Sequence, residues 1–436
     1  MAENQDIRES EIWINRGDEF INHGDLIRAN ECFSRALEFN TRSYTAYFKR
    51  GTVYEKSKNY AKAIIDFNNA IALNPDFSFA YFKRGSIFLE VRQYDNALND
   101  FNKAIALNPS LSFAYHKRGL IYLQKKEYDE AFEDFNFALQ LDPSMGQSYF
   151  QRGNIYFNKN EYSRAIEDYT KAIKYEPSNE NALISRGLAY INIKDYKDAL
   201  IDFSSVINKN PNSAAGYNYR GMAFVKVKDY LSALQDFQKL IELESENYDA
   251  YNNIGVVHFS MKEYLSAIED FTKALSTNPN SAQIYFNRGN AYYYLRKFNE
   301  ALTDYDNALH LNPRMYWAYY GKGNVLMMKN KIMEAIKEYT KSITINPQFY
   351  QAYISRGNAF IKLHYYSKAE EDYTLAIELR PNSYVGYLNR GIAFKKENKN
   401  DRAARDFMEF LRLVPKSTKA ASQVKRWLKQ MNYEVE

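Results

Sequence analysis

The sequence contains little cysteine, proline or histidine for its length. Its 436 residues include one cysteine, ten prolines and five histidines. The single thiol, Cys32, excludes an internal disulfide framework and suits a reducing compartment, so we expect a cytoplasmic protein. The histidines are scattered without the spacing of metal ligands, and we therefore predict no metal site.

Long apolar runs and the motifs of common enzymes are also missing. No apolar run approaches the roughly 20 residues that span a bilayer, so we expect no membrane partner, and the opening MAENQDIRES lacks the apolar core of a secretory signal. The sequence has no nucleophile elbow and no phosphate-binding loop. We therefore predict that the protein is not an enzyme and uses no cofactor. A net charge of +5 neither requires nor excludes nucleic acid.

What the sequence has in abundance is regularity. A glycine returns every 34 residues, twelve times and without an insertion or deletion, from Gly17 to Gly391. A fixed period of this size is typical of a solenoid, in which each unit buries its apolar face against its neighbours. The twelve units run over residues 10–417, with 9 residues before them and 19 after them. No catalytic domain fits in that remainder.

Other positions keep the same period. When each unit is numbered so that its glycine is position 8, position 20 is always alanine, position 24 is always aromatic, and all ten prolines stand at position 32. Positions 3, 4, 7, 8 and 11, and then 17, 20, 21, 24, 27 and 28, have the three-and-four spacing of a helical face. The pattern predicts two helices per unit, with glycine and alanine where the helices approach closely and proline ending the second helix.

These positions together resemble the tetratricopeptide repeat: an aromatic at 4, Gly at 8, Tyr or Phe at 11, Ala at 20, an aromatic at 24, Ala at 27 and Pro at 32. The resemblance implies an all-α, right-handed α-solenoid superhelix of antiparallel helix pairs, whose first helices line a concave groove that usually binds other proteins. We expect a flexible N-terminal tail over residues 1–9, twelve repeats over 10–417, and a C-terminal capping helix and tail over 418–436, with the helix at Thr418 to Met431.

Two further positions carry opposite charges. Position 7 is arginine and position 23 is aspartate in ten units each, and in the tenth unit both change together, to Lys322 and Glu338. We predict an ion pair between the two helices of one repeat, and give less weight to a row of ligand-binding arginines. Two units break the pattern, because Arg16 faces Cys32 and Asp270 faces Ile254.

The join between the seventh and eighth units departs most from the pattern. Ser245 stands where proline is usual, Leu240 replaces a small residue, and Ile254 removes the arginine. These changes suggest a hinge or a change of curvature, with simple drift in a tolerant array as the alternative. Superposing the two six-repeat halves would test the hinge, and undistorted stacking between Ile241 and Ile254 would exclude it.

The groove is predicted to be lined by positions 2, 5, 6, 9, 12 and 13, which vary between units. In repeats two to four, position 6 is lysine and two phenylalanines lie beside it: Lys49, Lys83, Lys117, Phe79 and Phe113. A ladder of this kind could hold the carboxylates of an extended acidic peptide. The alternative is that these are ordinary solvated lysines.

Repeats nine and ten contribute a second group. Exposed aromatics and methionines are typical of interface hot spots, and asparagines could bond the backbone of a partner. The candidates in these two repeats are Tyr293, Trp317, Tyr320, Asn287, Asn290 and Asn324, and position 9 of repeats five and eleven adds Asn154 and Asn358. Packing between adjacent units is the alternative explanation for the aromatics.

The sequence therefore favours a protein–protein interaction scaffold that holds an extended peptide or a partner helix in its groove. The alternative is a binder of nucleic acid or polysaccharide that uses the groove lysines and aromatics; we do not expect nucleic acid as a partner. Self-association through the aromatics of repeats nine and ten is a third possibility, compatible with the first.

Overall fold

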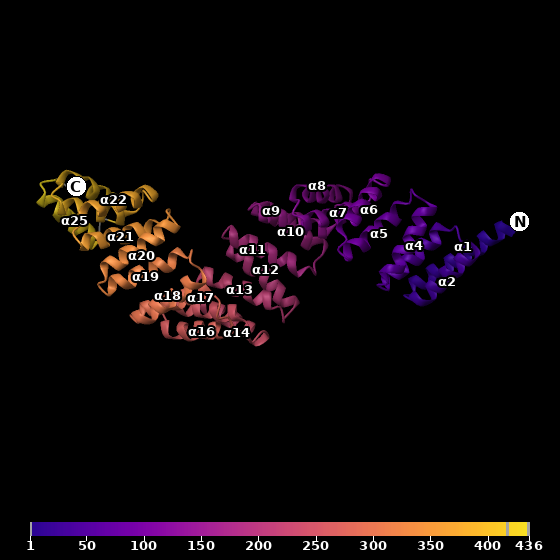
Figure 1. Ribbon diagram of the computed structural model, residues 1–436, viewed down its shortest axis with the longest axis horizontal. Helices are drawn as coiled ribbons and strands as arrows, with labels where there is room; N and C mark the ends of the chain where they lie inside the picture. The colour runs from indigo at the N-terminus through magenta and orange to yellow at the C-terminus, as the bar shows by residue number, and fades with distance from the viewer. Residues whose placement is uncertain (1, 416–417, 434–436) are drawn as a thin grey trace. The chain divides into compact units, whose positions relative to one another are not determined.

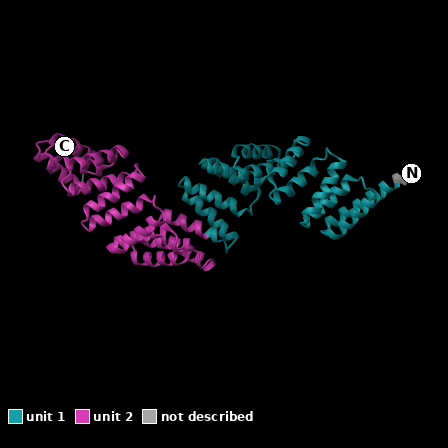
Figure 2. Cartoon of the chain, in the orientation of Figure 1, with its two compact units in different colours: residues 1–216 teal, residues 217–436 magenta. Residues whose placement is uncertain are grey.

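A computed structural model describes residues 2–415 and 418–433, and every regular element in this part of the chain is an α-helix. The predicted all-α solenoid class is confirmed. The chain divides into two compact units, Met1–Gly216 and Tyr217–Glu436 (Figure 2). Within each unit, consecutive helices lie side by side as antiparallel pairs (Figure 1).

The first unit holds the helix pairs of repeats one to six. Its helices are α1 (Ala2–Asn22), α2 (Leu26–Phe39), α3 (Tyr44–Lys56), α4 (Tyr60–Leu73), α5 (Ser78–Glu90), α6 (Tyr94–Leu107), α7 (Ser112–Lys125), α8 (Tyr128–Leu141), α9 (Gly146–Asn158), α10 (Tyr162–Tyr175), α11 (Glu180–Asn192) and α12 (Tyr196–Lys209). The segment 1–9, which we expected to be a flexible tail, is helical from Ala2 onward as the start of α1.

The second unit begins within α13 (Ala214–Val227). It continues through α14 (Tyr230–Leu243), α15 (Tyr248–Ser260), α16 (Tyr264–Thr277), α17 (Ala282–Tyr294), α18 (Phe298–Leu311), α19 (Tyr316–Met328), α20 (Ile332–Ile345), α21 (Tyr350–Lys362), α22 (Tyr366–Leu379), α23 (Tyr384–Lys396), α24 (Asn400–Leu413) and α25 (Lys419–Gln430).

A residue with left-handed backbone conformation stands at position 15, in the turn between the two helices of every repeat. In the first repeat it is Gly24, with φ of 75°. In the next eleven repeats it is a lysine, arginine, asparagine or histidine with φ between 57° and 66°. Only glycine adopts this region without steric cost, so each of these turns carries some backbone strain that the packing of the repeat must offset.

The glycine of each repeat lies against the aromatic ring of its second helix. A Cβ added to Gly323 would stand 2.5 Å from Cε1 of Tyr339, and one added to Gly17 would stand 2.5 Å from Cε1 of Phe33. The alanine at position 20 is fully buried in every repeat, as in Ala301. The predicted close approach of the two helices is therefore confirmed.

The predicted ion pair is also confirmed, and in nine repeats it is bidentate. Nε and Nη2 of the arginine donate to the two carboxylate oxygens of the aspartate 16 residues later, at 2.6–2.9 Å. The pairs are Arg50–Asp66, Arg84–Asp100, Arg118–Asp134, Arg152–Asp168, Arg186–Asp202, Arg220–Asp236, Arg288–Asp304, Arg356–Asp372 and Arg390–Asp406.

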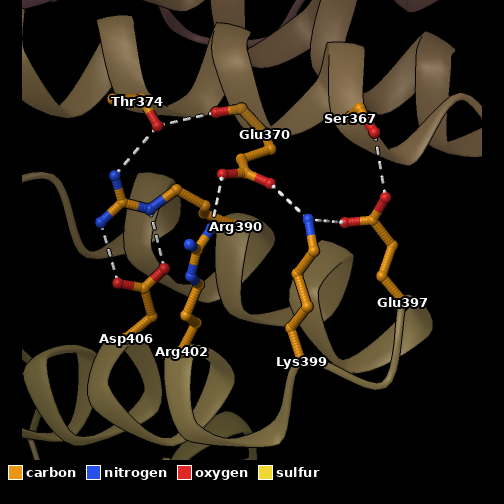
Figure 3. A network of polar contacts seen from close by, with 8 residues as sticks. All are labelled: Ser367, Glu370, Thr374, Arg390, Glu397, Lys399, Arg402 and Asp406. Carbon is orange, nitrogen blue, oxygen red and sulfur yellow. Dashed lines mark hydrogen bonds and ion pairs between the residues drawn. The ribbon is translucent and has the colours of Figure 1, made fainter.

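The same guanidinium also reaches the preceding repeat. Nη1 of Arg390 donates to Oγ1 of Thr374 at 3.0 Å, while the other two nitrogens hold Asp406 (Figure 3). Equivalent bonds run from Arg84 to Asn68 and from Arg288 to Thr272. Each such arginine therefore connects three helices: its own, the second helix of its repeat, and the second helix of the repeat before.

The predicted pair between Lys322 and Glu338 is wrong. Lys322 Nζ binds Asp306 at 2.6 Å in the preceding repeat, and Glu338 binds Lys341 instead. An ammonium concentrates its three donors on one nitrogen, whereas the guanidinium spreads its donors over a planar fork that reaches two helices at once. Lysine therefore keeps only the contact to the preceding repeat, and Oε2 of Glu338 is buried without a hydrogen-bond partner.

The join between repeats seven and eight is continuous. Ile254 lies in one apolar cluster with Phe237 and Val257, and Ile241 packs against that cluster. This packing is continuous at the join, and the hinge stays a prediction. Asp270, which lacks its arginine, instead accepts a hydrogen bond of 2.6 Å from Nδ1 of His258.

The C-terminal end of the array is covered by α25. Val424 and Leu428 are fully buried in a cluster with Phe407 and Phe410 of α24. Next to this end, Glu370 stands at position 21, which is apolar in most repeats, and binds Lys399 at 3.1 Å and Arg402 at 3.5 Å (Figure 3). Charged contacts thus replace apolar ones between the last two repeats.

We expect Asp304→Ala to lower the free energy of unfolding by about 3–5 kcal/mol, because Arg288 would remain largely buried without its partner. The hydrogen bond that Arg288 donates to Asp304 is also the main cause that raises the pKa of Arg288. Denaturant unfolding followed by circular dichroism measures the effect. Glu242→Ala, which removes an exposed ion pair with Lys239, is the matched control and should change stability by less than about 0.5 kcal/mol. Equal effects of the two changes would contradict the prediction.

We expect unit 1 to lose stability in mild acid because of His116. Burial lowers the pKa of His116 to about 4, and its Nδ1 lies 2.8 Å from Oγ of Ser148. A histidine that is neutral when folded and titrates near 6.5 when unfolded stabilises the fold fully above pH 6.5. That contribution falls by up to about 1.4 kcal/mol per pH unit as the pH drops from 6.5 toward 4.

The double variant His116→Phe with Ser148→Ala places at both positions residues that neighbouring repeats carry. Thermal melts between pH 7 and pH 4 should show a shallower loss of stability for this variant than for the natural chain. Parallel curves for the two proteins would show that His116 does not cause the acid sensitivity.

Candidate functional site

A cavity of about 530 Å³ opens along the first helices of repeats eight to ten in the second unit. It is lined by Phe259 of α15, by Gln283, Phe286, Asn290, Tyr293 and Tyr294 of α17, by Tyr305 of α18, by Met315, and by Trp317, Tyr320, Gly321 and Asn324 of α19. Most of these residues occupy positions 2, 5, 6, 9, 12 and 13 of their repeats. Of the residues predicted to line the groove in repeats nine and ten, all but Asn287 therefore share one cavity.

Gly321 makes room for this cavity. Position 6 is glycine in the tenth repeat alone. A Cβ added at Gly321 would stand 2.7 Å from Cζ and 3.0 Å from Oη of Tyr305, so a larger residue would displace this buried ring. The missing side chain leaves the edge of Tyr305 as part of the cavity wall.

Aromatic contacts fix the two ends of the cavity. At one end Trp317 and Tyr320 pack on the buried Phe349, with ring centroids 4.3 and 5.1 Å away. At the other end Tyr294 stacks on Tyr264 at 5.1 Å. Trp317 remains 41% exposed and Tyr294 57% exposed, so both rings present a free face to a ligand.

Buried tyrosines orient the asparagines of the cavity. Oη of Tyr305 donates to Oδ1 of Asn290 at 2.8 Å, and Oη of Tyr339 donates to Oδ1 of Asn324 at 2.8 Å. The carbonyl oxygen of each amide therefore already accepts a hydrogen bond, and its NH₂ group is the part that can donate to a ligand. Burial raises the pKa of Tyr305 far above the usual tyrosine value, so this hydroxyl keeps its proton.

The cavity thus offers aromatic surface and amide donors. None of the described residues that line it carries a charge. A large apolar or aromatic group fits such a surface, and amide NH₂ groups favour carbonyl oxygens as partners. A carboxylate or phosphate would find no cation there to compensate its desolvation.

The lysine ladder of repeats two to four differs from the expectation. Lys49 Nζ binds Asp18 at 2.7 Å and Lys83 Nζ binds Glu55 at 2.9 Å. Two of the three lysines are therefore already neutralised by the preceding first helix. Lys117 makes no ion pair with any described residue. The adjacent Phe79 and Phe113 are 46% and 54% exposed, as the prediction of an apolar edge requires.

The remaining predicted asparagines bond within the protein. Asn154 and Asn358 accept from the hydroxyls of Tyr169 and Tyr373, and Asn287 bonds to Asn252. The four tyrosines at position 24 are matched by the four asparagines at position 9, and every repeat with phenylalanine at 24 has another residue at 9. This covariation within one chain is the sequence signal that identifies these asparagines as partners of tyrosine.

Sequence reasoning missed several residues of the cavity wall. Gly321 is not among the residues predicted to line the groove, although no other repeat has glycine at position 6. Phe259, Phe286 and Met315 were not selected because aromatic and apolar residues are common at those positions. Only the packing of three successive repeats shows that they face the same space.

The fold and this site define a repeat protein whose helix pairs form an interaction surface. Models of the tetratricopeptide repeat match residues 44–77, 78–111, 112–145, 248–281, 282–315, 318–349, 350–383 and 181–213, and a further repeat model matches 153–194. The chain belongs to the tetratricopeptide repeat family. Six of these matches begin and end at the unit boundaries deduced from the glycine spacing. As a member of this family the chain is a protein–protein interaction scaffold.

Solved structures with similar folds include other proteins of this kind. Yeast Tom70 is 16% identical, with 98% of this chain and 96% of that chain covered and a TM-score of 0.47. Cut9 in the APC/C hetero-tetramer Cut9–Hcn1 is 14% identical, with 96% of each chain covered and a TM-score of 0.48. YrrB, a TPR protein with an unusual peptide-binding site, is 23% identical over 42% of this chain and 95% of that chain, with a TM-score of 0.39.

A search of curated proteins finds no match to this chain. Over the described residues, none of the helices combines the length and the apolar character needed to traverse a bilayer.

We expect Tyr305→Phe to free the amide of Asn290 while leaving the ring packing intact. Loss of one buried hydrogen bond should lower the free energy of unfolding by about 1 kcal/mol. The side-chain amide resonances of Asn290 should shift in NMR spectra, and those of Asn324 should not. Tyr294→Phe removes an exposed hydroxyl of the same cavity and is the control. An unchanged Asn290 resonance would show that Tyr305 does not orient it.

Proposed function

We propose that the protein binds an extended peptide segment of a partner along the first helices of repeats eight to ten. The partner inserts one large apolar or aromatic side chain between Trp317, Tyr320 and Tyr293, and its main-chain carbonyls accept hydrogen bonds from Asn290 and Asn324. The observation that carries this proposal is the uncharged cavity of about 530 Å³ in which these residues meet. Its size lies within the usual range for ligand pockets.

The proposed acidic peptide at repeats two to four has weaker support. The pairs Lys49–Asp18 and Lys83–Glu55 would have to break before these lysines could bind a carboxylate or a phosphate. The same reasoning weakens the alternative of a nucleic-acid ligand, since phosphate contacts depend on available cations. A polysaccharide stacked on the aromatics is tested by the experiment below.

The test selects peptides from a random library against the full chain and measures their affinity for variants. Trp317→Ala should weaken the selected peptides at least tenfold, because buried aromatic anchors contribute about 2 kcal/mol or more at interfaces. Tyr365→Ala, which removes a half-exposed ring of the same unit outside the cavity, is the matched control and should change affinity less than twofold.

Salt and competitors distinguish the classes of ligand. Affinity for a peptide held by apolar contacts should change little between 50 and 200 mM salt, whereas phosphate contacts would weaken it steeply. Peptides that bind Trp317→Ala as tightly as the natural protein, or that are displaced by soluble glucans, would contradict the proposal.

A further inference from the structure

The eighth repeat has a second cavity, separate from the aromatic one, at the position of its missing arginine. This cavity of about 560 Å³ lies among α14, α15 and α16. Its wall includes Gln238 of the preceding repeat, Tyr251, Ile254, His258 and Asp270. Ile254 occupies position 7, where ten other repeats carry arginine.

The fifth repeat provides an internal comparison. Its equivalent cavity has a volume of about 330 Å³ and is lined by Asn136, Tyr149, Arg152 and Lys171, the counterparts of Gln238, Tyr251, Ile254 and Lys273. Where arginine is present, its guanidinium fills the space between the aspartate and the preceding repeat. Where isoleucine replaces it, the cavity is larger and Asp270 becomes part of the wall.

The acceptors that an arginine would use are retained around this space. In the fifth repeat Arg152 binds Asp168 with two nitrogens and Asn136 with the third. Asp270 and Gln238 hold the same two positions in the eighth repeat. Asp270 lines the cavity, and His258 bonds to its Oδ2 while no described residue bonds to its Oδ1. The Gln238 side chain is exposed with no hydrogen-bond partner among the described residues.

The third group that contacts the arginine in other repeats is an aromatic ring. The guanidinium carbon of Arg152 stands 5.5 Å from the ring centroid of Tyr149, and similar contacts recur where position 7 is arginine. Tyr251 is the equivalent ring in the eighth repeat and lines the cavity. A guanidinium at this place would therefore meet a carboxylate, a side-chain amide and a ring face, as in the repeats that carry their own arginine.

The other charged groups around the cavity are compatible with such a ligand. Lys273 lies near Tyr251, with Nζ 5.9 Å from the ring centroid. Its counterpart Lys171 has the same contact with Tyr149 although Arg152 is present, so this lysine does not prevent a guanidinium from entering. Lys239 and Glu242 bind each other at 2.9 Å and contribute no net charge.

We propose that the eighth repeat binds a guanidinium group, supplied by an arginine side chain of a partner protein. The ligand would donate one hydrogen bond to Oδ1 of Asp270 and another to the side-chain oxygen of Gln238, and would stack against Tyr251. A planar fork presents its donors on separate nitrogens, and this geometry spans two acceptors on different helices better than an ammonium, whose donors share one nitrogen. This site is independent of the peptide cavity proposed above.

The test titrates the full chain with N-acetyl-arginine amide and follows the side-chain resonances of His258 and Ile254 by NMR. The citrulline analogue, which has nearly the same shape but no charge, should bind at least tenfold more weakly, since it loses the charge-assisted bond to Asp270. The lysine analogue should also bind more weakly. Free arginine carries two extra charges, so a preference for it over the blocked form would overturn the assignment to a partner's side chain.

Two variants separate binding from folding. Ile254→Arg should bring a guanidinium into the cavity within the chain, raise the midpoint of thermal unfolding and abolish binding of the probe. Ile254→Leu keeps the cavity and is the matched control that should bind as the natural protein does. Equal binding of the arginine and citrulline probes, probe binding that survives Ile254→Arg, or no binding of any probe would overturn the proposal.

Discussion

The bond between the arginine at position 7 and the aspartate at position 23 is the interaction on which the regularity of the array depends. The two charges are largely removed from water, so their attraction must offset a desolvation cost on both sides. Burial raises the pKa of Asp100, and the hydrogen bond to that carboxylate raises the pKa of Arg84. Because the guanidinium has a third nitrogen, it also fixes the distance to the preceding repeat. One residue type thus sets both the helix pair and the stacking of neighbouring pairs.

The repeats that depart from this rule show why the residue must be arginine. With lysine at position 7, the tenth repeat keeps one contact and leaves Glu338 with an unpaired buried oxygen. With isoleucine there, the eighth repeat uses His258 to hold Asp270 and opens a cavity beside it. These exceptions lie in the second unit, close in sequence to the aromatic cavity. Local loss of the regular contact and the appearance of space for a ligand therefore go together in this part of the chain.

The asparagines illustrate how a structural and a binding role combine in one side chain. The tyrosine at position 24 needs an acceptor for its buried hydroxyl, and the carbonyl oxygen of the asparagine at position 9 provides it. This bond determines which end of the amide remains available. In repeats nine and ten the available end is a donor within the aromatic cavity. The scaffold thereby orients the groups with which we propose it binds peptide carbonyls.

The sequence by itself determined the two helices of each repeat, the close contact at the glycine, and the ion pair of the nine repeats that carry both arginine and aspartate. The glycine recurs twelve times and the ion pair nine times in one chain, so the spacing of each feature supports it many times over. The sequence could also have linked Asn290 to Tyr305, since position 9 is asparagine only where position 24 is tyrosine.

Only the tertiary structure decided which contacts run between repeats. The partner of Lys322 is Asp306 rather than Glu338, and Asp18 and Glu55 neutralise two lysines of the predicted ladder. A cavity requires several side chains to face the same space. At Gly321 it also requires that the residue has no side chain, because a Cβ there would meet Tyr305. Spacing along the chain fixes the face of a helix on which a residue lies. The distance to the neighbouring repeat is set by how all the side chains between them pack.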